Sequence, residues 1–126
     1  MITSREILDV ALCFVDRELN GRELEVLEDL CRSAGESWAE QLREGLEPED
    51  CRSAFTIASA WSALAGMLAV MEGTQPTPRS FTAGDLSVRT GGESGRATAK
   101  TLRGQAETLM APYVEGGVFA FLEVRG

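Results

Sequence analysis

The chain has 126 residues, a formal net charge of −8 and no histidine. A chain of this length suits one domain, and it can bury enough apolar surface to fold without a disulfide or a metal. The excess of acidic residues argues against a protein that holds nucleic acid by neutralising its phosphates. We expect residues 1–126 to form a single helical domain.

The first predicted helix covers residues 4–19. Thr3 and Glu6 have the spacing of a capping box, which satisfies free backbone N–H groups at a helix start. The pair Asn20 and Gly21 suits a left-handed turn and predicts the end of this helix. The apolar positions recur at helical spacing and predict an inward stripe of Ile7, Leu8, Ala11, Leu12 and Val15.

The second predicted helix covers residues 22–44 and is amphipathic. Its apolar face contains Leu27, Leu30, Cys31, Ala34, Trp38 and Leu42. Its charged face contains Glu25, Asp29, Arg32, Glu36 and Glu40. Gly35 in the middle costs about 1 kcal/mol relative to alanine, so we expect a bend or a close contact there.

The third predicted helix covers residues 48–72 and has no charged residue between positions 53 and 71. A helix that is apolar nearly all round is either a core helix or a membrane span. Serine and threonine interrupt its first half, and no basic cluster or aromatic belt flanks it, so we expect a core helix and no membrane. Bulky apolar residues recur every four or three positions and predict the main buried face of this helix, which consists of Ile57, Trp61, Leu64, Leu68 and Met71.

The pattern then changes to a period of two over residues 80–89, with a slip at Gly84 and Asp85 that a bulge or tight turn would produce. We expect a short β-hairpin or a bent strand there. A fourth helix is predicted over residues 94–113, with Ala99, Leu102, Ala106, Leu109 and Tyr113 at helical spacing. Residues 118–124 are β-prone and predict a short C-terminal strand that needs cover within the chain or from another subunit. The fold class is thus mainly α, a four-helix bundle-like domain with these short β elements.

The sequence offers little for catalysis, metals or cofactors. Without histidine, the commonest general base and metal ligand is absent. Cys13, Cys31 and Cys51 lack the close spacing of a zinc site, and their odd number does not suit a disulfide framework; we expect buried, reduced thiols in a reducing compartment. Gly91, Gly92 and the following residues do not form a phosphate-binding motif. We predict no catalytic, metal-binding or cofactor-binding residue.

Three segments together carry a family resemblance. They are SFTAGDLSV at residues 80–88, REGLEPEDC at residues 43–51 leading into an alanine-rich helix, and LMAPYVEGGVFAFLEVRG at residues 109–126. In this order the chain resembles the small head–tail connector, or adaptor, proteins of tailed phages and prophages. The resemblance covers most of the chain.

This resemblance implies a structural subunit that forms an oligomeric ring at the virion neck, between the portal and the tail. DNA would pass through the ring without specific binding, which the net charge of −8 allows. The protein would occupy the host cytoplasm during assembly and the neck in the mature particle. The contacts between subunits, or to the portal, would fall on Phe81, Thr82, Ala83, Gly84, Asp85, Leu86, Ser87 and Val88.

Two other functions fit the sequence less closely. A small cytosolic protein-interaction or regulatory helical module would bind a defined cellular partner and lie outside any phage gene cluster. An enzyme would need a polar, concave site with at least two carboxylates whose titration is perturbed.

Overall fold

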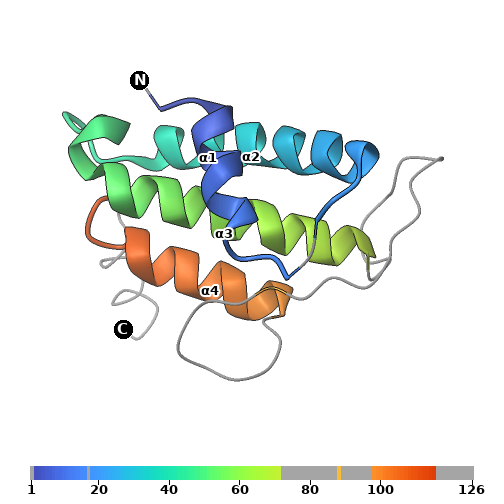
Figure 1. Cartoon of the computed structure of the whole chain (residues 1–126). Coiled ribbons are helices and arrows are strands. Elements are labelled where there is room, and N and C mark those ends of the chain that lie inside the picture. The colour runs from blue at the N-terminus through green and yellow to red at the C-terminus, as the bar shows by residue number, and fades with distance from the viewer. Residues whose placement is uncertain (1, 17, 72–87, 89–97, 116–126) are drawn as a thin grey trace.

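A computed structural model describes residues 2–16, 18–71, 88 and 98–115. It contains α1 (Ser4–Leu12), α2 (Gly21–Gln41), the 3-10 helix η1 (Pro48–Cys51), α3 (Arg52–Met71) and α4 (Ala99–Met110). Figure 1 shows α3 in the middle of the molecule, with α4 on one side of it and α1 crossing α2 and α3 on the other. The predicted mainly helical, bundle-like fold is confirmed. The expected β-hairpin is not shown: apart from Val88, residues 80–89 lie outside the described part of the chain, as do residues 118–124.

Helix α3 is the core of this bundle. From residue 63 to residue 70 every position is buried, because α1, α2 and α4 all pack against it. The stretch Pro48–Val70 is long and apolar enough to cross a membrane by length and composition, and 72% of the most apolar window is buried inside the domain. Core helices of soluble proteins have the same length and composition, and the burial of this stretch agrees with the prediction of a core helix.

The buried surface of α3 is wider than the predicted stripe. Leu64 and Leu68 are buried as expected, but Ile57 and Trp61 are only half-buried. The core gains Phe55 and Met67 instead, together with a set of small residues (Ala58, Ala60, Ala63, Ala65 and Ala69). A single stripe describes a helix that packs on one neighbour, whereas α3 has neighbours on several sides.

Helix α1 ends at Leu12, so its predicted extension to residue 19 is wrong. Asn20 does not end a helix but begins one. Its side chain accepts a hydrogen bond from the Glu23 N–H (2.8 Å), and the Glu23 carboxylate accepts one from the Asn20 N–H (2.9 Å). Asparagine is favoured as the N-cap of a helix as well as in turns, so the residue type alone did not distinguish the two. The capping box of Thr3 and Glu6 is confirmed.

The other helix boundaries also differ from their predictions. Helix α2 ends at Gln41 rather than at residue 44, and the first turn of the third predicted helix is the 3-10 helix η1. Helix α4 begins after its N-cap Thr98 and ends at Met110 rather than at residue 113, while residues 94–97 of the predicted helix lie outside the described part of the chain. The chain then turns so that Val114 forms an antiparallel bridge with Leu42. This bridge joins two residues that follow the ends of their helices and that lie far apart in the sequence. Helical periodicity, which compares residues a few positions apart, cannot predict it.

Gly35 makes the close contact that its position predicts. A Cβ atom at Gly35 would lie 3.0 Å from Cδ1 of Ile7, which shows that α1 crosses α2 at this point. For Gly104 in α4, none of the described residues has an atom within 4 Å of such a Cβ.

The two glycines therefore predict different responses to alanine. We expect Gly104→Ala to raise the free energy of unfolding by about 1 kcal/mol, which is the helix-propensity difference. Gly35→Ala should gain less than Gly104→Ala or lose stability, because Ile7 must shift to admit the methyl group. Urea denaturation of both variants measures this difference, and an equal gain at both sites would contradict the close packing of α1 on α2.

The cysteines divide into one exposed and two buried thiols. Cys31 and Cys51 are buried as predicted, but Cys13 is exposed because α1 ends at the preceding residue. Burial, with a smaller effect of the Glu28 charge, raises the pKa of Cys31 to about 12. Burial and the Asp50 charge also raise the pKa of Cys51.

Iodoacetamide labelling of the native chain at pH 8 should therefore modify Cys13 first, and Cys13→Ser should remove this fast reaction. The pKa of an unfolded cysteine thiol is about 8.5. The free energy by which the raised pKa of Cys31 stabilises the fold is therefore fully present below that pH. This contribution is lost as the pH rises through the folded value of about 12. Rapid labelling of Cys31 without denaturant would contradict its burial.

Candidate functional site

The predicted contact residues lie in the connection between α3 and α4. This connection runs from residue 72 to residue 98. Apart from Val88 and Thr98, its residues lie outside the described part of the chain.

Val88 is the member of the contact segment that the structure describes. It has no exposed surface and forms an isolated antiparallel bridge with Val15, just after α1. Phe81, Thr82, Ala83, Gly84, Asp85, Leu86 and Ser87 lie outside the described residues. Val88 therefore anchors the connection to the domain, and its side chain is not part of the surface of this chain.

A hollow of about 690 Å³ opens between α1, the second half of α2 and the start of α3. We call it the α1–α2 groove. Its apolar lining includes Ile2, Ile7, Ala39, Pro48 and Phe55. Ile7 and Phe55 are only 2% and 3% exposed, so they belong to the buried core beneath the groove.

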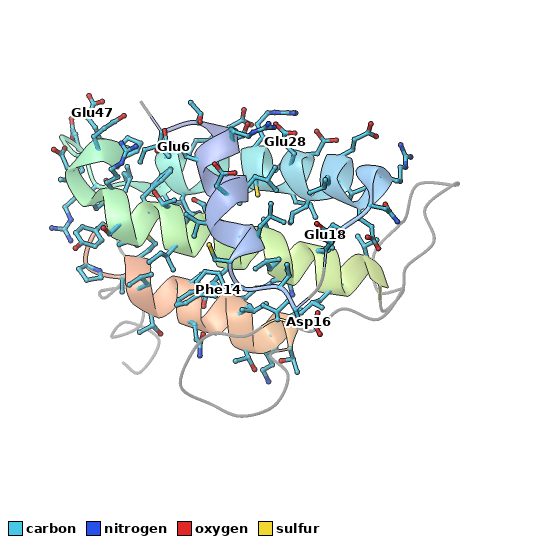
Figure 2. The ribbon with its side chains drawn as sticks, viewed as in Figure 1. Glu6, Phe14, Asp16, Glu18, Glu28 and Glu47 are labelled. Carbon is cyan, nitrogen blue, oxygen red and sulfur yellow. The ribbon has the colours of Figure 1, made fainter. Side chains whose placement is uncertain are left out.

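Charged side chains border the same groove. Arg32 and Glu36 come from α2, and Glu47 and Glu49 come from the start of the η1 segment. In Figure 2, Glu6 and Glu47 lie on the side of the molecule that carries α1 and α2. The groove thus combines an apolar floor with a mostly acidic border, which is the general composition of a binding site for an apolar group.

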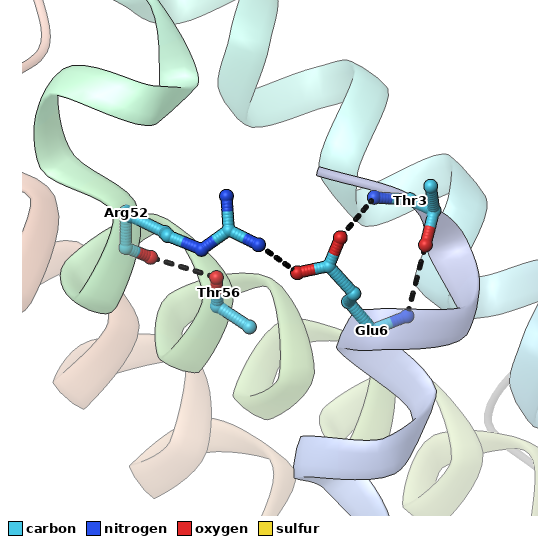
Figure 3. A network of polar contacts seen from close by, with 4 residues as sticks. All are labelled: Thr3, Glu6, Arg52 and Thr56. Atoms are coloured by element: carbon cyan, nitrogen blue, oxygen red, sulfur yellow. Dashed lines mark hydrogen bonds and ion pairs between the residues drawn. The ribbon is translucent and has the colours of Figure 1, made fainter. Parts of the chain in front are cut away.

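A polar network ties the start of α1 to the start of α3 beside this groove (Figure 3). The Glu6 carboxylate accepts a hydrogen bond from the Thr3 N–H (3.4 Å) and forms an ion pair with Arg52. The Thr56 hydroxyl donates to the carbonyl oxygen of Arg52 at 2.7 Å. Partly exposed ion pairs contribute only about 0–1 kcal/mol, so this network adds little to the stability of the domain.

A second hollow, of about 700 Å³, is more open and lies over α3 and α4. It is lined by Trp61, Lys100, Thr101, Gly104, Gln105, Thr108 and Leu109. The indole N–H of Trp61 and Oε1 of Gln105 are buried and have no hydrogen-bond partner among the described residues. A buried polar group that stays unsatisfied costs about 1–3 kcal/mol.

Among the described residues, no group of three or more cysteine, aspartate or glutamate side chains is placed so that it could hold a metal ion. The acidic residues of α2 that sequence spacing pairs (Glu25 with Asp29, and Glu36 with Glu40) are all exposed. Arg22 pairs with Glu25 at 3.3 Å and Arg32 with Asp29 at 3.0 Å, as expected on a solvated helix face.

The α1–α2 groove is not predictable from the spacing of residues within any one helix. Its walls come from three segments that are distant in sequence, and helical periodicity describes each helix separately. Gly35, with Ala39 one turn later, is the local signal, since small residues on one face of α2 leave room beside α1. Comparison of the chain with protein-family models, with characterised proteins and with solved structures finds no match.

Proposed function

We propose that this protein is a structural subunit of a phage or prophage head–tail connector. Its copies form an oligomeric ring at the virion neck between the portal and the tail. The observation that carries the proposal is the bridge of Val88 with Val15, which fastens the last residue of the family-like segment to the helical domain. A rigid bundle with an attached contact segment suits a subunit whose work is assembly.

The surface chemistry supports a structural role over a nucleic-acid-binding one. The net charge of −8 disfavours tight binding of DNA phosphates, so DNA would pass through the ring without specific binding. The subunit would form in the host cytoplasm and end in the neck of the particle. In this proposal residues 81–87 make the contacts to a neighbouring copy or to the portal, and Val88 holds them at the domain.

The proposal is tested by light scattering and negative-stain microscopy of the purified protein, alone and with the portal protein of the same phage or prophage. We expect a ring of copies on the portal. A strict monomer that does not bind the portal would contradict the proposal.

A variant pair sharpens this experiment. Gly84→Val should reduce ring formation while the helical circular dichroism stays unchanged, because the substitution falls in the contact segment. Gly104→Ala, in α4, should assemble as the unmodified chain does. Loss of helical signal in Gly84→Val would show instead that Gly84 serves the fold of the single chain.

A second candidate function is a small cytosolic protein-interaction or regulatory module. The α1–α2 groove favours it, because an apolar floor with an acidic border could receive an apolar segment with basic flanking residues. The neighbouring genes distinguish the two functions, since a connector gene lies among genes for virion assembly.

A further inference from the structure

We propose that the α1–α2 groove binds a segment of a different protein in which a bulky apolar side chain is flanked by lysine or arginine residues. This inference goes beyond the connector, since it assigns a binding specificity to a surface that the ring contacts do not use. It rests on the second candidate function and states which chemistry of partner the groove selects.

The floor of the groove suits a bulky apolar side chain. Its volume of about 690 Å³ lies within the range of sites that enclose apolar ligands, about 300–1,000 Å³. Ile7 and Phe55 are buried core residues at its base, and Gly35 and Ala39 leave the α2 wall without a bulky side chain. An apolar side chain that enters the groove therefore reaches the core.

The charges on the border of the groove are unequal. Carboxylates stand on two of its walls, with Glu36 on α2 and with Glu47 and Glu49 at the start of the η1 segment. The one cation among the lining residues, Arg32, pairs at 3.0 Å with Asp29, which lies outside the groove lining. Glu36 is exposed and forms no ion pair within the described part of the chain. The border therefore attracts a basic segment.

The same charges disfavour other occupants. An acidic segment would lie against like charges, which costs binding free energy and excludes wrong partners. A second copy of this chain itself carries a net charge of −8, so two copies repel each other at this acidic face. A basic segment with an apolar anchor gains from the floor and from the border together, which favours a different protein as the partner.

A pair of peptides tests this specificity on the full-length protein. The probe is a blocked synthetic peptide with a central leucine and phenylalanine between two pairs of lysines. Its control has glutamates in place of the lysines. Calorimetric titration measures both dissociation constants, and we expect the lysine peptide to bind and the glutamate peptide not to bind.

Charge-matched variants locate the binding site. Ala39→Arg adds a cation to the groove wall and should weaken binding of the lysine peptide by at least about tenfold, whereas Ser33→Arg, exposed on α2 outside the lining, should not. Glu36→Gln should weaken binding by about two- to fivefold, and Glu40→Gln, exposed outside the lining, is its control. Circular dichroism checks that each variant keeps its helices.

An NMR titration of the ¹⁵N-labelled protein identifies competing occupants. The N–H of Glu115 donates to the carbonyl oxygen of Gln41 at 2.9 Å, so the last eleven residues of the chain begin near the groove. We expect the lysine peptide to shift the amides of Ile7, Gly35 and Ala39 and to leave those of residues 116–126 in place. Shifts of both sets together would assign the groove to the chain's own end.

Three further results would overturn the inference. They are no binding of the lysine peptide, equal weakening by the groove variants and their controls, and groove shifts that depend on protein concentration without peptide, which would indicate a second copy. The connector is tested separately. Ring formation on the portal does not depend on peptide binding, so either proposal can fail while the other holds.

Discussion

Leu64→Ala should lower the free energy of unfolding by about 2–5 kcal/mol. Leu64 has no exposed surface and lies in the part of α3 where every position is buried. The loss combines the transfer free energy of the removed atoms with the cavity that they leave, because α1, α2 and α4 cannot all close around α3. Small domains have a total stability of about 5–15 kcal/mol, so this single change removes a large part of it.

Ile57→Ala is the matched control for this substitution. Ile57 lies on the same helix and in the same predicted stripe, but its side chain is only half-buried. It should cost clearly less than Leu64→Ala, at about 1–2 kcal/mol. Urea denaturation followed by circular dichroism measures both values. Equal losses at the two positions would mean that α3 packs through one stripe and is not enclosed on several sides.

Trp38→Ala should have an effect of similar size, about 3–5 kcal/mol. Trp38 is only 8% exposed and connects α2 to α3, because its indole N–H donates to the Ser62 hydroxyl at 3.0 Å. The substitution removes the aromatic packing and this hydrogen bond together. Thermal and urea denaturation should both show the loss.

Ser62→Ala and Trp38→Phe separate the two contributions. Ser62→Ala removes the acceptor alone and should cost about 1 kcal/mol, since a hollow of about 220 Å³ beside both residues offers room for water. Trp38→Phe keeps most of the aromatic packing and should fall between the other two variants. If Ser62→Ala cost as much as Trp38→Ala, the hydrogen bond rather than the packing would hold α2 on α3.

Local sequence patterns predict the existence and order of the helices. The capping box of Thr3 and Glu6, the charged face of α2 and the uncharged stretch of α3 each depend on residues within a few turns of one another. Gly35 belongs to the same class, since its place inside a helix signals a close contact before the neighbour is known. These features are short-range, so periodicity and spacing are sufficient to find them.

Tertiary structure decided the features that join distant segments. Val15 was predicted to lie in the first helix but forms a bridge with Val88 after α1 has ended. Leu42 was predicted to lie in the second helix but forms a bridge with Val114 after α2 has ended. The exposure of Cys13, the partial exposure of Trp61 and the α1–α2 groove follow from where those segments meet. The sequence by itself determined a bundle around an uncharged helix, because helical periodicity is a local property. Only the packing of the helices decided which faces are closed and which groove stays open, because burial depends on neighbours that are far away in the chain.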